Sequence, residues 1–225
     1  MPVQNPVFPQ LLASSGVGVI SIGSGTMNTT DGALTLTTAL AAQPSGTVQV
    51  FCAASAGLTA GLYYATFSST SALQLWTDAA ATVKPATSAG AYTADLNDNT
   101  LATISLPAGI MGANGVLEVI TLWQVPNNAN AKNGRVKMGG ATWKDANLAS
   151  TASCRDMCRI MNRGSQAVQI CGVQSAVSFG TSSSNPVTGA VNTASAQTIT
   201  ITALRGAAGD SIKLEAYEIY VWPKA

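Results

Sequence analysis

Short runs in which apolar and polar residues alternate recur along the whole chain. Residues 34–37 and 198–204 alternate without interruption, and Gly, Pro, Asn or Asp residues stand between one run and the next. A period of two indicates β-strands with one buried face, and we expect about a dozen short strands joined by turns. The runs cover 17–22, 34–37, 48–52, 62–67, 73–76, 101–106, 116–125, 135–138, 166–171, 198–204 and 212–221.

Three segments depart from this pattern. Residues 78–100 are rich in Ala, Thr, Asp and Asn and predict a long loop or a subdomain boundary. Residues 154–161 fit a short helix or a strand equally well. The last run changes its apolar phase, which predicts a β-bulge near Tyr217 and Glu218. Because the chain contains no long amphipathic pattern, the sequence predicts an all-β sandwich or barrel.

The first residues differ from the rest because prolines recur among them. Proline removes a backbone donor and disfavours helix, so residues 1–16 are predicted to form an extended anchoring arm. Residues 17–100 would then form an N-terminal β region and residues 101–225 the sandwich, although 17–225 would also fit one compact unit. The residues expected to anchor the arm are Pro2, Val3, Pro6, Val7, Phe8 and Pro9.

Charge is scarce in this chain. Charged residues make up 9% of 225 residues, against about a quarter in ordinary soluble domains, and histidine is absent. The missing imidazoles exclude the commonest general base and zinc ligand, and a net charge of +1 argues against nucleic-acid binding. The first Lys or Arg is Lys84, so no basic signal peptide is expected, and no apolar stretch is long enough for membrane insertion. A neutral surface indicates an assembly component, because interface cores are depleted of charge.

No catalytic motif, cofactor loop or metal-ligand spacing is present, so we expect no enzymatic activity, no cofactor and no metal. Paired carboxylates are the one catalytic arrangement that the composition allows. Exposed strand charges and turn residues explain these carboxylates better than catalysis. The candidates are Glu118, Asp145, Asp156, Asp210, Glu215 and Glu218.

The four cysteines do not form a recognisable scaffold. Only Cys154 and Cys158 are close in sequence, whereas a structural zinc site normally shows two short pairs. We expect Cys52, Cys154, Cys158 and Cys171 to be free thiols packed as small hydrophobic groups, although a disulfide stays open.

The two halves of the chain carry opposite net charge. Residues 1–116 hold one Lys against four Asp, and residues 117–225 hold ten basic against six acidic residues, which would suit head-to-tail contact between subunits. Ordinary solvated turns explain the clustering of basic residues in the second half of the chain better than a docking patch does. Among the tryptophans, Trp76 and Trp123 lie in apolar runs typical of a core. The candidate surface contacts are Lys132, Arg135, Trp143 and Lys144, with Trp143 expected to be exposed.

Several segments together resemble a group of bacteriophage virion proteins. They include Gly61–Thr70, Ala91–Thr93, Leu106–Gly115, the stretch 128–140 and Asn162–Ser165. Over residues 50–225 the chain is similar to the jelly-roll β-sandwich module of phage fibre, head-fibre and decoration proteins. The Cys154 and Cys158 pair does not belong to this pattern.

The resemblance implies a fold and a role. It implies a jelly-roll-like antiparallel β-sandwich in a non-enzymatic, homotrimeric protein on the outside of the virion, assembled in the bacterial cytoplasm beside other capsid or tail proteins. A head decoration or head-fibre protein is the first hypothesis. The alternative is a short tail-fibre or receptor-binding protein that recognises host surface polysaccharide. A carbohydrate-active enzyme is the third hypothesis.

Overall fold

A computed structural model describes residues 9–15, 18–172 and 182–224, and every regular element among them is a β-strand. This confirms the all-β prediction. Strands of the N-terminal part are β2 Val19–Ser21, β3 Gly25–Met27, β4 Ala33–Leu36, β5 Thr47–Cys52, β6 Gly61–Phe67, β7 Ala72–Trp76 and β8 Gly90–Tyr92. The others are β1 Gln10–Ser15, β9 Asn99–Leu106, β10 Val116–Gln124, β11 Lys132–Met138, β12 Ala141–Asn147, β13 Ser153–Asn162, β14 Gln169–Cys171, β15 Val187–Gly189, β16 Gln197–Arg205 and β17 Ile212–Trp222.

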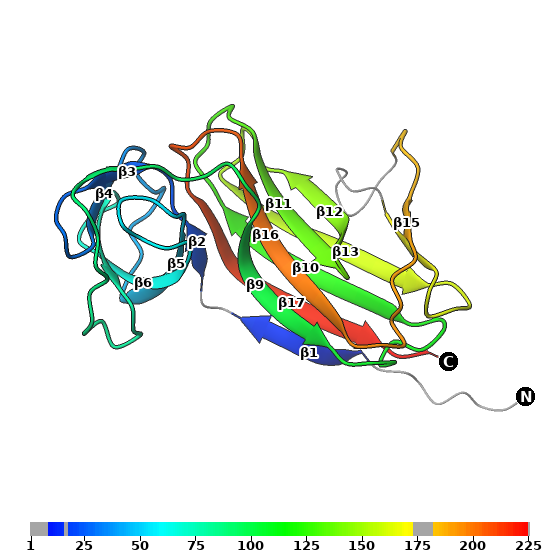
Figure 1. Ribbon diagram of the computed structural model, residues 1–225. Coiled ribbons are helices and arrows are strands. Elements are labelled where there is room, and N and C mark those ends of the chain that lie inside the picture. Colours follow the sequence, from blue (N-terminus) through cyan, green and yellow to red (C-terminus); the bar gives the residue numbers. More distant parts are fainter. Residues whose placement is uncertain (1–8, 16–17, 173–181, 225) are drawn as a thin grey trace, which may run out of the picture.

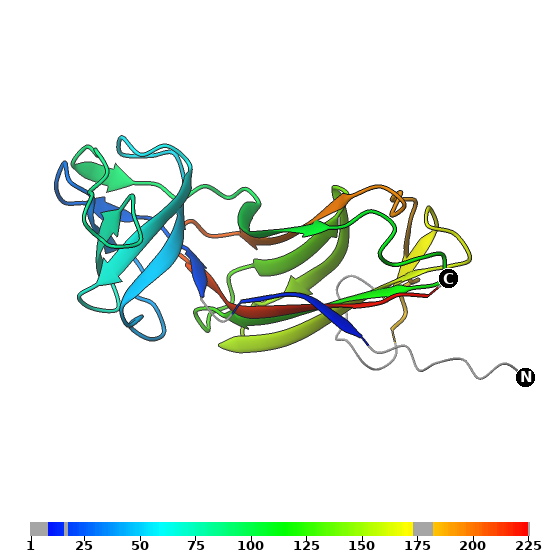
Figure 2. The same cartoon turned by 90° about the horizontal axis from the view of Figure 1, so that it is seen from below.

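These strands form two sheets. The larger has the order β15-β14-β13-β10-β17-β2-β5-β6-β7-β4-β3-β8, with β1 paired to β17, and the smaller has the order β12-β11-β16-β9. Neighbouring strands are antiparallel except β2 and β5, which are parallel. Figure 2 shows the smaller sheet packed over β1, β17, β10 and β13, so this part of the chain is a β-sandwich. The jelly-roll connection order stays a prediction.

Two hydrophobic cores lie in different parts of the chain. The first contains Val19 and buried residues between Leu101 and Val221, and it fills the sandwich. The second contains buried residues between Ile20 and Ala94. We call residues 20–94 the N-terminal lobe; in Figure 1 the β3–β8 part of the larger sheet curls around this core, beside the sandwich.

Arg205 joins the lobe to the sandwich. It ends β16 and is 2% exposed, and its Nη1 donates a hydrogen bond of 2.5 Å to the carbonyl of Ile22. Its Nη2 donates to the hydroxyl of Ser21 and, at 3.4 Å, to Oδ1 of Asn99. Burial lowers the pKa of Arg205, and the nearby Tyr92 acts in the opposite direction. One guanidinium therefore connects the start of the lobe to the beginning of β9.

The segment 154–161 lies in strand β13, which resolves its ambiguity. The strand pairs with β10 from Val116 opposite Met161 to Gln124 opposite Ser153. Strands β6 and β7 form a hairpin, since they pair with each other across residues 68–71. In β17 the bulge lies between Leu214 and Ala216, slightly before the predicted place. The extra residue there directs both Leu214 and Ile219 into the core.

The start of the chain departs in part from the predicted arm. Five of the six anchoring candidates, Pro2 to Phe8, lie outside the described residues, and Pro9 is exposed. Gln10–Ser15 form β1, which pairs with β17 from Gln10 opposite Val221 to Ser15 opposite Tyr217. Residues 10–15 of the predicted arm are therefore extended and form a strand of the larger sheet, and the anchoring role of residues 1–16 stays a prediction.

Candidate interaction surface

Trp143 is buried, so the prediction that it is exposed is wrong. Its exposed fraction is 0%, and its Nε1 donates to the carbonyl of Met138. The register of β11 with β12 shifts opposite Thr142 and Lys144, which makes Trp143 the extra residue of a bulge and turns it inward. Gly189 lies against the ring, since a Cβ at that glycine would stand 2.6 Å from Cη2 of the indole.

Lys132 is also buried, which contradicts its predicted surface role. Its Nζ donates to Oδ1 of Asn128 at 2.7 Å and to the carbonyl of Asn130 at 2.8 Å, and it lies 3.9 Å from Oδ2 of Asp210. Burial lowers the pKa of Lys132, and the charge of Asp210 opposes this effect. The amides of Asn128 and Asn130 donate to the two Asp210 oxygens. Lys132 therefore connects the loop that contains Asn128 and Asn130 with the loop that contains Asp210.

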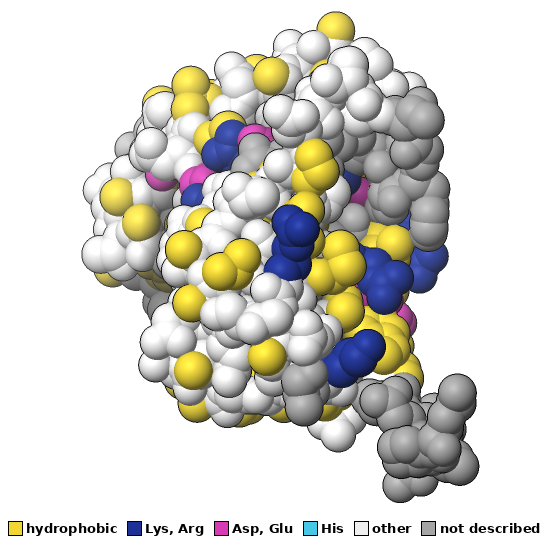
Figure 3. Space-filling model, turned by 90° about the vertical axis from the view of Figure 1, so that its right-hand side faces the viewer, with side chains coloured by type: hydrophobic (Ala, Val, Ile, Leu, Met, Phe, Trp, Pro, Cys, Tyr) yellow, Lys and Arg dark blue, Asp and Glu magenta, His cyan; other side chains and the backbone are white. Residues whose placement is uncertain are grey.

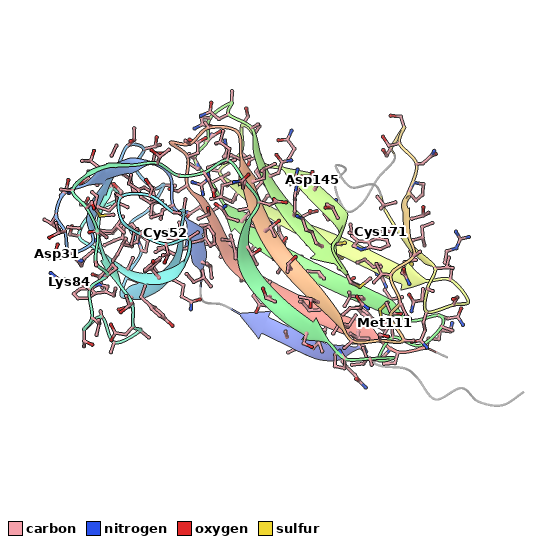
Figure 4. The ribbon with its side chains drawn as sticks, viewed as in Figure 1. Asp31, Cys52, Lys84, Met111, Asp145 and Cys171 are labelled. Carbon is pink, nitrogen blue, oxygen red and sulfur yellow. The ribbon has the colours of Figure 1, made fainter. Side chains whose placement is uncertain are left out.

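Lys144 and Arg135 likewise serve the fold. Lys144 of β12 lies 3.4 Å from Asp156 of β13, and this nearly buried pair joins the two sheets of the sandwich. Arg135 lies 3.0 Å from both Asp98 and Asp145. Lys144 is thus not the surface contact that we predicted, and Arg135 is 22% exposed with its charge compensated. Figure 4 labels Asp145 on the smaller sheet.

Each of the six candidate carboxylates has a partner in the same chain. Each of Glu118, Asp145, Asp156, Asp210 and Glu215 lies within ion-pair distance of a Lys or Arg of the same chain. Glu218 accepts a hydrogen bond from the hydroxyl of Tyr220 at 3.1 Å. Among the described residues, no group of three or more His, Cys, Asp or Glu could hold a metal ion.

The cysteines are free thiols, as predicted. Cys52, Cys158 and Cys171 are buried, and Cys154 is half-buried. The Sγ atoms of Cys158 and Cys171 lie 3.6 Å apart on neighbouring strands. Figure 4 shows Cys52 in the lobe, far from Cys171 in the sandwich. A contact to Cys171 and burial raise the pKa of Cys158, so its thiol is protonated near neutral pH.

The surface that sequence reasoning missed is the outer side of β13, β10 and β17, which we call the outer face. Side chains that alternate with the buried ones point away from the core on these strands. In β13 the outward residues alternate between Arg and Met. The outer face consists of Arg155, Met157, Arg159 and Met161 of β13, Val116, Glu118, Ile120 and Leu122 of β10, and Ala216, Glu218, Tyr220 and Trp222 of β17.

An aromatic and cationic cluster lies at one end of the outer face. The Arg159 guanidinium is 5.3 Å from the centroid of the Trp222 ring, and its Nε is 3.2 Å from Oε2 of Glu118. The rings of Tyr220 and Trp222 are 6.1 Å apart. The hydrogen bond to Glu218 raises the pKa of Tyr220. Leu11 of β1 extends the face, since it lies opposite Tyr220.

The outer face has the composition of a protein interface. Leu11, Leu122 and Met161 are 56%, 40% and 38% exposed. Trp, Tyr, Met and Arg are the residues enriched in interfaces, and Trp, Tyr and Arg contribute most of the binding energy. In the end-on view of Figure 3, hydrophobic side chains lie next to Lys and Arg side chains on the right-hand side. The signal in the sequence was the Arg and Met alternation, which is readable only once 154–161 is known to be a strand.

No protein-family model matches this chain, and no curated protein is similar to it at a significant level. The described residues contain no helix with the length and apolar character that crossing a bilayer requires.

Proposed function

We propose that this chain is a non-enzymatic structural protein on the outside of a bacteriophage virion, a head decoration or head-fibre protein attached through the residues that precede β1. In this proposal it is a homotrimer with a jelly-roll sandwich, and its other partners are virion proteins. The observation that carries the assembly role is the outer face. It combines exposed apolar residues with Arg and aromatic residues, on a chain that otherwise has few charges.

The arrangement of the charges supports an assembly role. Much of the charge is compensated within the chain. The compensated groups are the buried ion pairs Lys132–Asp210 and Lys144–Asp156 and the half-buried cluster around Asp98. The surface is consequently still more neutral than the composition indicates. Neutral surfaces favour contact with other protein, because few charges must be desolvated when the contact forms.

The attachment is tested by deleting residues 1–9, which leaves β1 and its pairing with β17 intact. We expect the truncated protein to fold and to be absent from purified particles, whereas the full chain is incorporated. Circular dichroism and thermal unfolding of the purified proteins serve as the control for folding. Full incorporation of the truncated chain would contradict attachment through this segment, and immunogold labelling of particles would show whether the chain lies on the head or the tail.

The aromatic cluster favours a second candidate, a short tail-fibre protein that binds host surface polysaccharide. Tyr220 and Trp222 lie side by side on the outer face, and aromatic rings stack on sugar rings. In that case purified protein should compete with phage adsorption, and Tyr220→Ala should abolish the competition. Adsorption unchanged at saturating protein would exclude this candidate.

A further inference from the structure

We infer that the outer face is the surface through which copies of this chain associate with one another, around an axis that runs parallel to β10. The inference deepens the proposed function and rests on it only for the expectation that the chain is an assembly component. The occupant of the face is a second copy of the same chain, because the face is complementary to itself in charge and in the position of its apolar residues.

The strand register places two arginines of the outer face on β13, at one side of the face, and Glu218 on β17, at the opposite side. Met157, Ile120 and Glu218 lie in one row across β13, β10 and β17. On β13, the next row in one direction along the strands contains Arg159, and the next row in the other direction contains Arg155. Successive outward residues of a strand are about 7 Å apart. The β13 side therefore carries two cations, and the β17 side carries one carboxylate at a level between them.

An axis parallel to β10 brings opposite charges together. Rotation about such an axis places β13 of one copy against β17 of the next, and it does not shift residues along the strand direction. Each row of one copy therefore faces the same row of its neighbour. Glu218 of each copy then faces the space between Arg155 and Arg159 of its neighbour. Arg159 already has Glu118 at 3.2 Å, whereas none of the described carboxylates lies within ion-pair distance of Arg155. Glu218 of a neighbouring copy supplies that partner.

The apolar residues occupy the positions that this packing buries. Val116, Ile120 and Leu122 of β10 would meet their counterparts beside the axis, and so would Glu118, whose charge is compensated by Arg159 of the same chain at 3.2 Å. Met161 on the β13 side would face Trp222 on the β17 side, a pairing of an adaptable side chain with a flat ring. Burying Leu11, Leu122 and Met161, which are exposed on the outer face and on the adjoining β1, supplies a hydrophobic contribution that the free chain lacks.

The packing closes on itself. Two or three copies around one axis each use the β13 side once and the β17 side once, so no half of the face is left over. A partner of another kind would have to reproduce both halves of the pattern. The closed ring also leaves the N-terminal lobe free of the contact, since the residues of the outer face come from β10, β13 and β17.

The first experiment measures the mass of the purified full-length protein by light scattering over a range of concentrations. For a 22.8 kDa chain we expect a species of two or three copies. Leu122→Glu should convert it to a monomer, because a carboxylate would be buried beside the axis. Leu62→Glu is the matched control, since Leu62 is 50% exposed on the N-terminal lobe and should not change the mass. Thermal unfolding verifies that both variants are folded.

A charge exchange tests the packing itself. Arg155→Glu and Glu218→Arg should each weaken association by about tenfold, because each places like charges together. The double variant should restore the dissociation constant to within about threefold of the original, since it reverses the pair. A wild-type monomer at every concentration, an associated Leu122→Glu variant, or a double variant as weak as the single ones would overturn the inference. A chain that associates but is absent from virions would instead contradict only the proposed function.

Discussion

Gly134 of β11 lies directly against the indole ring of Trp123 on β10: a Cβ added to the glycine would stand 2.5 Å from Cε2 and 2.7 Å from Cζ2 of that ring. Trp123 is 1% exposed, and its Nε1 donates to the hydroxyl of Thr121 at 2.9 Å. The glycine belongs to the smaller sheet and the tryptophan to the larger one. The absence of a side chain at residue 134 therefore lets the ring fill the space between the two layers.

Gly134→Ala should destabilise the protein. A methyl group would have to displace the ring, because real Cβ atoms do not approach other atoms as closely as 2.5 Å. Overpacking of a core costs about 1–3 kcal/mol, and we expect the free energy of unfolding in urea to fall by that amount. Gly61→Ala is the control, since nothing lies within 4 Å of a Cβ there. Equal stability of the two variants would show that the two sheets can accommodate a methyl group beside Trp123 without loss of stability.

Asp98→Asn should reduce stability in a way that depends on pH. Burial raises the pKa of Asp98, but hydrogen bonds from Lys137 and Arg135 outweigh it and hold the pKa below its ordinary value. The stabilisation by the ionised carboxylate is complete above the unfolded pKa of about 3.9 and is lost as the pH falls through the lower folded pKa. Urea unfolding should show a deficit of roughly 1 kcal/mol at pH 7.

The same deficit should shrink as the pH falls below about 3.9 and disappear below the folded pKa, because both the variant and the protonated wild type then lack the charge. Comparing wild type with variant at each pH removes the contributions of the other carboxylates. A deficit that stays constant down to pH 2 would mean that the ion pairs with Arg135 and Lys137 do not stabilise the fold.

Arg205→Met should weaken the junction between the lobe and the sandwich. The substitution keeps a long apolar side chain but leaves the carbonyl of Ile22 without the donor that Arg205 supplies, whereas Oδ1 of Asn99 still accepts from the hydroxyl of Ser21. A buried acceptor without a partner costs about 1–3 kcal/mol, so we expect a loss of about 2 kcal/mol in the free energy of unfolding. Lys213→Met is a control for removing a cation, because Lys213 pairs with Glu215 near the surface.

Proteolysis separates local from global effects of Arg205→Met. The variant should be cleaved faster than wild type between residues 95 and 100, where the chain passes from the lobe to β9, while fragments of the sandwich persist. Cleavage distributed evenly over the chain would show that Arg205 stabilises the whole protein rather than the junction.

Alternation predicted most strands well because the residues that face the core are apolar. Residues 197–205 form β16, where the buried residues Ile199 and Ile201 follow the pattern. The segment 154–161 was ambiguous because Asp156 faces inward and interrupts the apolar phase. Its partner, Lys144, comes from the other sheet. A charge pair between strands that are distant in sequence leaves no periodic signal.

The same reason explains the errors at the predicted surface residues. Lys132 is buried because Asn128, Asn130 and Asp210 supply its partners, and Asp210 lies far along the chain. Trp143 is buried because β12 contains a bulge, which alternation cannot place. The outer face could be assembled only from strand register, since its residues come from three strands that are not consecutive.

The four thiols should differ in reactivity toward an alkylating reagent at pH 8. Cys52, Cys158 and Cys171 are at most 3% exposed, so the reagent cannot reach their sulfur atoms in the folded protein, and burial also raises the pKa of Cys52. Burial also raises the pKa of Cys154, but its side chain is partly exposed. The native protein should therefore take up one label at Cys154, at least about tenfold faster than at the others, which need local opening first. Peptide mass spectrometry identifies the site, and Cys154→Ser should remove the fast phase. Labelling of Cys158 or Cys52 at the rate of Cys154 would mean that the core opens readily around them.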